Sequence, residues 1–277
     1  MKRPIADRDS IRDFWEANPV AAASIDAPLG SPEFFAAYDR LRERNETAEF
    51  SHRLHEYDRF AAQRVLDVGC GNGYVLSRYA AAGAKVYGVD LTTKAIELTR
   101  KRFQLLNLEG DFRIAEAEYL PFADRTFDCV TCMGVLHHVP DTERSVAEIR
   151  RVLKPGGRLI VMVYHRNSAL YRIRFPIDSL LKRKSIQQLV NEVDGVGNRK
   201  GDVYSRAELR GLLAGFDAVE LEVRLLQPWM VIPGGNRLIV SHWLQPFERR
   251  LGWFLYAKAR NPTRAGANPP SSMRDTA

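Results

Sequence analysis

Strand-like and helix-like segments alternate along most of this 277-residue chain, which predicts an α/β fold. The expected architecture is a doubly wound, seven-stranded, mostly parallel sheet with helices on both faces, together with N-terminal helices and a helical cap insertion. Residues 64–90 form the clearest unit, a strand, a glycine turn, a helix and a second strand. The composition, 45% hydrophobic and 27% charged, is that of a globular protein and excludes a disordered or fibrous one.

Residues 1–60 are expected to form a helical extension. Ser31 stands where a helix N-cap would lie, and Pro32 occupies the first helical position after it. Apolar residues then recur at helical spacing, namely Phe34, Phe35, Tyr38 and Leu41.

Residues 61–165 are expected to form the core of the sheet. Apolar runs predict strands at 64–68, 85–90, 112–115, 127–132 and 158–164, and helical patterns cover 74–82, 92–106 and 141–153. The run 154–157, Lys-Pro-Gly-Gly, ends the last of these helices.

The remaining sequence divides into three parts. Residues 166–204 depart from the alternation and are expected to form the cap. Residues 205–260 complete the sheet, with a capping box from Ser205 to Glu208, a strand at 216–223 and an edge strand at 253–260. Residues 261–277, rich in Pro, Ser and Ala, are expected to be a disordered tail.

Location and cysteine usage follow from simple patterns. No apolar run approaches the ~20 residues of a membrane span, and the charged N-terminus lacks a signal peptide, so a cytoplasmic location is expected. Cys129 and Cys132 lie three apart on a predicted strand and therefore point to opposite faces. With Cys70, they are expected to be buried free thiols that bind no metal.

The glycine turn after the first strand predicts a ligand site. Its glycines permit a tight turn and close approach of a ligand to the backbone. A dinucleotide fingerprint would need glycine at Tyr74, and the lysine of a phosphate-binding loop is absent. Asp67 precedes the turn, and Asp90 ends the second strand, where a carboxylate can accept both hydroxyls of a ribose. Acids around the turn favour a cationic nucleoside, and S-adenosylmethionine has both an ammonium and a sulfonium group.

The run 65–73, Val-Leu-Asp-Val-Gly-Cys-Gly-Asn-Gly, resembles motif I of the class I S-adenosylmethionine-dependent methyltransferases, of the small-molecule, methyltransferase-11-like type. Residues 88–91, 115–122 and 134–157 resemble the later motifs in the same order. The resemblance covers about residues 60–165 and implies a Rossmann-like fold. It also implies transfer of a methyl group to an O, N, S or C nucleophile of a small-molecule acceptor by in-line displacement.

The resemblance implies a role for each motif residue. Asp67 lies near the methionine ammonium, Asp90 holds the ribose, and Leu91 packs on the adenine. Glu116 stands where the family usually has Asp, and with Ala117 it addresses the polar edge of the adenine. The full set of cofactor-binding residues implied is Asp67, Gly69, Cys70, Gly71, Gly73, Asp90, Leu91, Glu116, Ala117, Met133 and His138.

A general base is needed only if the acceptor must lose a proton. Three histidines at the carboxyl edge of the sheet are candidates: His137, His138 and His165. No metal is expected, because the acids named are committed to the cofactor and no histidine–carboxylate cluster is apparent.

The cap segment carries six basic residues between Arg166 and Lys184 against one acid, Asp178. An apolar stripe at helical spacing accompanies them: Leu170, Ile173, Ile177, Leu180 and Leu181. This pattern predicts either a lid that packs its stripe on the core or a lip for an anionic, lipid-linked or membrane-associated acceptor.

Three other functions and the oligomeric state stay open. A methyltransferase of RNA or another macromolecule is one, although nucleic acid is not favoured because residues 132–135 lack the Asn/Asp-Pro-Pro-aromatic motif of base-amino enzymes. A nicotinamide oxidoreductase is weakened by Tyr74. The third is a cofactor-binding regulator without catalysis. The chain is expected to be a monomer or a homodimer.

Overall fold

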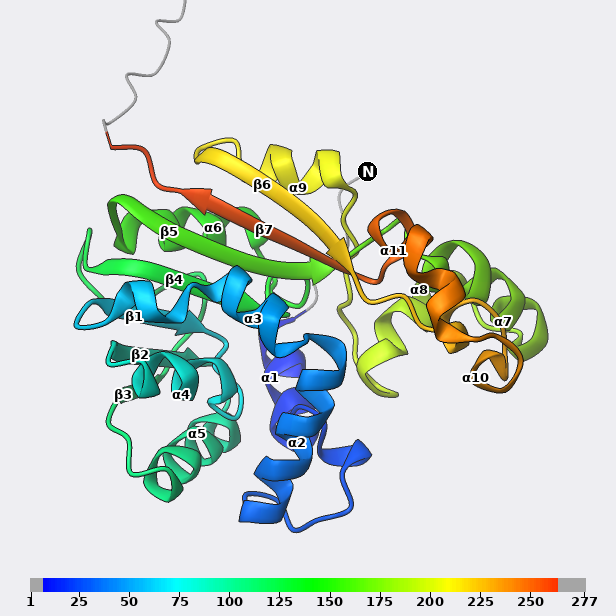
Figure 1. Ribbon diagram of the computed structural model, residues 1–277, viewed down its shortest axis with the longest axis horizontal. Helices are drawn as coiled ribbons and strands as arrows, with labels where there is room; N and C mark the ends of the chain where they lie inside the picture. Colours follow the sequence, from blue (N-terminus) through cyan, green and yellow to red (C-terminus); the bar gives the residue numbers. More distant parts are fainter. Residues whose placement is uncertain (1–6, 264–277) are drawn as a thin grey trace, which may run out of the picture.

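The computed structural model describes residues 7–263, and its centre is one seven-stranded sheet. The strands are β1 (Arg64–Val68), β2 (Lys85–Asp90), β3 (Asp111–Ile114), β4 (Phe127–Met133), β5 (Leu153–Tyr164), β6 (Asp217–Arg224) and β7 (Phe254–Arg260). Their order is β3-β2-β1-β4-β5-β7-β6, and only β7 runs antiparallel to its neighbours (Figure 1). The predicted fold class is confirmed.

Helices precede the sheet, as expected for the N-terminal segment. They are α1 (Arg8–Ala17), η1 (Ala22–Ser24), α2 (Pro32–Asn45), α3 (Ala48–His55) and η2 (Tyr57–Phe60). The Ser31 hydroxyl accepts a hydrogen bond from the Phe34 amide at 3.1 Å, and this contact caps α2 as predicted.

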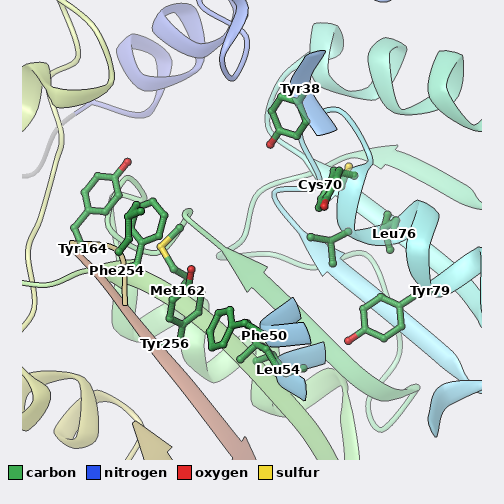
Figure 2. Packing of buried hydrophobic residues seen from close by; sticks show 14 of the residues in the cluster. Tyr38, Phe50, Leu54, Cys70, Leu76, Tyr79, Met162, Tyr164, Phe254 and Tyr256 are labelled. Atoms are coloured by element: carbon green, nitrogen blue, oxygen red, sulfur yellow. The ribbon is translucent and has the colours of Figure 1, made fainter. Parts of the chain in front are cut away.

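Each face of the sheet has its own hydrophobic core. Helices α3, α4 (Tyr74–Ala81) and α5 (Thr93–Leu105) cover one face, where Phe50, Leu76, Tyr79 and Tyr256 pack together (Figure 2). Helices α6 (Thr142–Val152) and α9 (Arg206–Leu212) cover the other face. Because successive side chains of a strand point to opposite faces of the sheet, the strands contribute residues to both cores.

Two expectations for the cysteines are confirmed: Cys129 and Cys132 lie on opposite faces of the sheet, and all three are buried free thiols. Cys129 belongs to the core beneath α3 and α4, and Cys132 belongs to the core beneath α6 and α9. Both are buried free thiols, as is Cys70. Burial raises the pKa of each thiol, so the thiolate form that would bind a metal is disfavoured.

The expectation that the last strand lies at an edge is wrong. β7 lies between β5 and β6, and β6 is the edge strand. The run Phe254-Leu255-Tyr256-Ala257 is buried throughout, whereas only Val223 is buried in β6. Chain order alone did not reveal this, because β7 enters the sheet antiparallel to its neighbours.

The cap comprises η3 (Leu170–Arg174), α7 (Phe175–Lys182), α8 (Ile186–Asn191) and η4 (Glu192–Asp194). The predicted apolar stripe does not pack as a unit, because Leu180 is 84% exposed and Leu181 is 70% exposed. η3 is a π-helical turn, whose i to i+5 hydrogen bonds break the 3.6-residue period that the stripe assumed. Phe175 and Asp178 face inward in α7 instead.

A second helical segment lies between β6 and β7, where the sequence predicted only the end of the sheet. It contains η5 (Pro228–Met230), α10 (Gly235–Leu238), η6 (Ser241–Leu244) and α11 (Gln245–Leu251). Figure 1 shows α10 and α11 beside α7 and α8 at one end of the molecule.

The predicted disordered tail falls almost entirely on residues 264–277, outside the described part of the chain. Within residues 7–263, no helix has the length and apolarity needed to cross a lipid bilayer.

Candidate functional site

The carboxyl ends of β1, β2 and β4 open onto one cavity. Ten of the eleven residues predicted to bind a cofactor line it: Asp67, Gly69, Cys70, Gly71, Asp90, Leu91, Glu116, Ala117, Met133 and His138. Ligands of open α/β sheets bind at this edge, where the strand order reverses between β1 and β4. The predicted set therefore converges in space.

The turn after β1 brings backbone to the cavity wall. Gly69 has φ 75°, and a Cβ on it would lie 2.2 Å from a methyl group of Val135. Gly69 therefore admits no other residue without a shift of this wall. Gly73 does not line the cavity, in contrast to the prediction. It instead precedes α4 with φ 77°, against Thr99, and so completes the turn.

Asp90 is held in place at the end of β2. One carboxylate oxygen accepts from the Gly71 amide at 3.1 Å, and the other accepts from the Thr92 amide and hydroxyl at 3.0 and 2.9 Å. Burial raises its pKa, whereas these hydrogen bonds lower it. The carboxylate is thus oriented, and it lines the cavity.

Asp67 is the second acid of the site, and it is buried. Its carboxylate accepts a hydrogen bond from the Thr131 hydroxyl at 2.6 Å. Burial raises the pKa of Asp67 to about 7, although the bond from Thr131 lowers it. No side-chain cation neutralises Asp67 by direct ion pairing within the described residues, so a cationic ligand group would be favoured there.

The opposite part of the cavity is apolar, with one polar edge. Leu91, Ala117 and Val139 supply the apolar wall. Glu116 lies at the rim and forms an ion pair with Arg8 at 3.0 Å. This arrangement suits a flat aromatic base with polar groups along one edge.

Helix α1 closes the cavity, a role that sequence reasoning missed. Arg8, Ile11 and Trp15 all line the cavity and follow one another by three and four positions. That spacing places them on one helix face. The spacing was visible in the sequence, but nothing in it indicated that this face would cover a site 50 residues downstream.

Arg42 of α2 is the second residue that the sequence did not indicate. It lines the cavity, its Nη2 lies 2.8 Å from a Glu46 carboxylate oxygen, and its Nε is buried without a hydrogen-bond partner. A buried donor without a partner is costly, so Arg42 favours an acceptor group on a ligand. A carboxylate is the natural partner of a guanidinium group.

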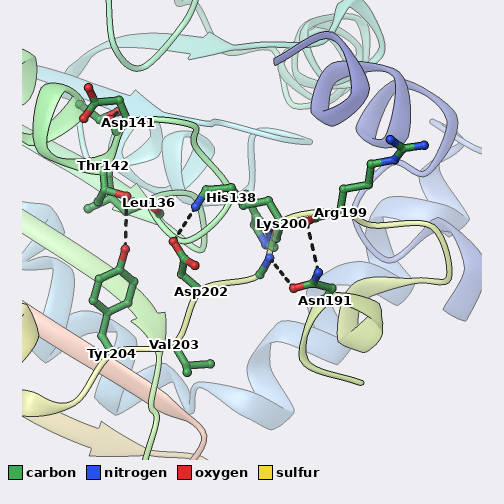
Figure 3. A network of polar contacts seen from close by, with 12 residues as sticks. Leu136, His138, Asp141, Thr142, Asn191, Arg199, Lys200, Asp202, Val203 and Tyr204 are labelled. Carbon is green, nitrogen blue, oxygen red and sulfur yellow. Dashed lines mark hydrogen bonds and ion pairs between the residues drawn. The ribbon is translucent and has the colours of Figure 1, made fainter. Parts of the chain in front are cut away.

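His138 lines the cavity, and the cap holds it from the other side. Its Nδ1 lies 2.6 Å from the Lys200 carbonyl, and its Nε2 lies 3.4 Å from a carboxylate oxygen of Asp194. The Tyr164 hydroxyl donates to the other Asp194 oxygen at 2.5 Å. In Figure 3, Lys200 and Asp202 of the cap segment lie near His138, and Asn191 lies beside Arg199.

The other two predicted bases lie outside this cavity lining. His137 is fully buried, neither ring nitrogen has a hydrogen-bond partner, and burial lowers its pKa well below the ordinary value. His165 lies 3.0 Å from the Gly252 carbonyl through Nδ1 and lines a separate cleft beside β6. Of the three histidines, His138 alone reaches the cavity.

The expectation that no histidine–carboxylate cluster exists is wrong. Ligand atoms of His137, His138 and Asp194 all lie within 4.8 Å of one another. Asp194 comes from the cap, so the cluster forms only when the chain folds. Two of the three residues, His138 and Asp194, form a polar contact at 3.4 Å. This contact explains why they lie close together.

Comparisons with known proteins agree with this geometry. A family model described as a methyltransferase domain matches residues 66–161. A ubiquinone biosynthesis O-methyltransferase of Thiobacillus denitrificans is 39% identical over 112 residues, which is 40% of this chain and 48% of that protein. A protein of the same name from Xanthomonas axonopodis pv. citri is 31% identical over 172 residues, which is 61% of this chain and 69% of that protein.

Solved structures share the fold. The [4+2]-cyclase SpnF has a TM-score of 0.60 at 20% identity, covering 94% of this chain and 98% of that one. An S-adenosylmethionine-dependent methyltransferase from Methanosarcina mazei has a TM-score of 0.56 at 23% identity, covering 76% and 98%.

The matches cover different shares of the chain and of its relatives. The chain spans about half the length of several curated relatives that it matches, 48% and 53% in two cases. The match to the Xanthomonas protein extends over 69% of that protein. The methyltransferase-domain model, which matches residues 66–161, includes Asp67, the glycine turn, Asp90 and the later motifs. The chain belongs to the class I S-adenosylmethionine-dependent methyltransferases.

Proposed function

We propose that this protein transfers a methyl group from S-adenosylmethionine to a hydroxyl oxygen of a small-molecule acceptor. The observation that carries this proposal is the pair Asp67 and Asp90, which flank a glycine turn inside one cavity. The name O-methyltransferase, shared by the relatives described above, favours oxygen among the possible nucleophiles.

The residues present fit this cofactor. Asp67 would hold the ammonium group, Arg42 the carboxylate, and Asp90 the ribose hydroxyls. Leu91, Ala117 and Glu116 would hold the adenine, and Met133 would lie by the methionine chain. Each partner has the charge or polarity that the corresponding group requires.

When bound, the cofactor supplies a methyl group on a sulfonium, which an oxygen nucleophile displaces in line. The protein contributes mainly by positioning the reactants and excluding water. Trp15 and Ile11 of α1 cover the cavity, and Asp194 and Lys200 of the cap hold His138 at its wall.

His138 is the proposed general base. Since its Nδ1 faces the Lys200 carbonyl, that nitrogen carries the hydrogen, and the basic lone pair resides on Nε2. The Asp194 carboxylate beside Nε2 stabilises the imidazolium that forms when the acceptor loses its proton. His137 and His165 lack this access to the cavity.

The proposal gives no role to a metal, because displacement at a sulfonium requires no Lewis acid. Turnover that a chelator abolishes and a divalent ion restores would contradict this part. A cytoplasmic location and a lipid-linked acceptor stay predictions from the sequence.

Calorimetry tests the cofactor assignment. We expect S-adenosylmethionine to bind with a Kd in the micromolar range, as metabolic enzymes commonly bind their substrates. Asp90→Ala removes the acceptor for the ribose hydroxyls and should weaken binding by about 1–3 kcal/mol, roughly 5- to 150-fold. Unchanged affinity in this variant, or tighter binding of a nicotinamide dinucleotide, would refute the assignment.

A further inference from the structure

Large apolar side chains are exposed at the end of the molecule formed by the cap and by the connection between β6 and β7. Besides Leu180 and Leu181, Leu238 is 71% exposed and Trp243 is 62% exposed. The set called the apolar end below, which leaves out the exposed Val196 of the loop after η4, is Ile173, Leu180, Leu181, Ile186, Leu238, Val240, Trp243 and Phe247. Single exposed apolar residues are common, but a group of this size marks an interaction surface.

The two segments that carry these residues are joined. η3 of the cap packs against η5, and the Arg174 guanidinium donates to the Trp229 carbonyl at 2.8 Å. Figure 1 shows α7, α8, α10 and α11 gathered at the same end, opposite β3. The exposed side chains therefore belong to one region of the molecule.

Helix α7 departs from the usual amphipathic pattern. Its inward face contains Phe175 and also a charged residue, Asp178, which is buried and forms an ion pair with Arg174 at 2.8 Å. Its outward face contains Leu180 and Leu181. A helix that faces water normally places polar residues outward, so the outer face of α7 is suited to an apolar medium.

Unpaired positive charge accompanies the exposed apolar residues. Three exposed arginines of these segments have no ion-pair partner among residues 7–263: Arg172, Arg183 and Arg237. Arg249 and Arg250 of α11 line the cleft beside β6 together with Glu220 and Glu222. The acids nearby are engaged, since Asp178 pairs with Arg174 and Lys182, Glu192 with Lys184, and Glu248 with Arg224. The unpaired charge of the apolar end is therefore positive.

Exposed apolar side chains together with unpaired arginines favour one kind of binding partner over the others. A second copy of the chain would bring the same positive charges face to face, which repel each other. Nucleic acid would match the arginines but would leave the leucines in water. An anionic lipid bilayer satisfies both, because leucine and tryptophan side chains enter the headgroup region while arginines contact lipid phosphates.

We propose that the apolar end binds peripherally to anionic membrane surfaces. Leu180, Leu181, Leu238 and Trp243 insert at the level of the headgroups, and the unpaired arginines contact the lipid phosphates. The same cap reaches His138 through Asp194 and Lys200, so the surface adjoins the wall of the cofactor cavity. This inference stands without the proposed function, because lipid binding requires neither cofactor nor acceptor.

Vesicle co-sedimentation of the full chain tests the proposal. The protein should bind vesicles that contain phosphatidylglycerol and phosphatidylcholine, and it should bind pure phosphatidylcholine much less. Binding should weaken between 0.1 and 1 M salt, because the Debye length falls from about 10 to about 3 Å. Trp243 emission should shift to the blue on binding, and Trp243→Phe should lose this shift while it still binds.

Paired variants distinguish membrane binding through the apolar end from nonspecific hydrophobic adsorption. Leu180→Asn with Leu181→Asn should lower the partition coefficient by about tenfold or more, because two inserting side chains are lost. Leu105→Asn with Leu106→Asn changes two exposed leucines at the end of α5, outside the apolar end, and should bind as the wild type does. Unchanged thermal unfolding would show that both variants fold.

Three results would overturn the proposal. The first is an absence of binding to the anionic vesicles. The second is equal loss of binding in the two leucine variants. The third is a dimer, seen by light scattering, that Leu180→Asn with Leu181→Asn converts to a monomer, since a second copy would then be the occupant.

Discussion

Asp67 is a buried carboxyl whose pKa of about 7 makes ligand binding sensitive to pH. A bound ammonium group would lower this pKa, so binding requires that the carboxyl lose its proton. Affinity for S-adenosylmethionine should therefore rise about tenfold per pH unit below 7 and level off above it. Above about pH 7.7–8.0 the α-amino group of the ligand loses its own proton, and affinity should fall again.

Calorimetric titrations between pH 5.5 and 8.5 measure this profile. Asp67→Asn cannot titrate, so the rising limb should disappear in that variant. A wild-type affinity that is flat between pH 5.5 and 7 would show that Asp67 does not contact the cation.

His138 and Asp194 are predicted to affect the chemical step. His138→Gln should lower kcat by about 10²- to 10⁴-fold, the usual contribution of a general base. Asp194→Asn should lower kcat less, because it acts through His138. Cofactor affinity measured in parallel should change little. Equal loss of affinity and of kcat would indicate a structural role instead.

The sequence predicted single residues where they lie in one contiguous motif. The glycine turn, Asp67 and Asp90 follow one another within a strand–helix–strand unit whose geometry is known. Arg42, Trp15 and Asp194 were missed, because Arg42 and Trp15 reach the cavity, and Asp194 reaches His138, from distant segments. Their residue types are equally common on ordinary helix surfaces, so only the tertiary structure identifies them.

At the scale of secondary structure, α1 is predicted to slow the release of the cofactor. Trp15 lines the cavity and also contacts the His138 ring, with the ring centroids 5.0 Å apart. Trp15→Ala should speed dissociation of S-adenosylmethionine by roughly tenfold, because about 1–2 kcal/mol of apolar contact is lost. Stopped-flow measurement of the dissociation rate checks this.

Arg12→Ala is the matched control on the same helix. Arg12 does not line the cavity and pairs with Asp9 at 3.0 Å on the surface, so its loss should leave the dissociation rate unchanged. Identical dissociation rates for the wild type and Trp15→Ala would mean that α1 does not act as a cover.

Elements with strong local signals were predicted well, and irregular ones were not. The capping box of α9 forms as expected, because Ser205 and Glu208 suffice to specify it. The apolar stripe of the cap failed at the π-helical turn of η3, where one extra residue per turn rotates the following helix. No local sequence rule predicts such a turn.

For the whole molecule, the sequence predicted the class of fold and the edge at which ligands bind. The strands β1, β4 and β5 consist mostly of buried residues, which is typical of a parallel sheet. The place of β7 and the helices before it could not be predicted, since they depend on long-range pairing with β5 and β6.

Transfer of a labelled methyl group tests the central claim most directly. The full chain is incubated with S-adenosylmethionine labelled on the methyl carbon, together with a metabolite and lipid extract, and the products are separated by size. We predict that the label enters a low-molecular-mass product as a methyl ether and that His138→Gln slows its appearance. Label found in RNA or protein, or no transfer despite tight cofactor binding, would contradict the proposed activity.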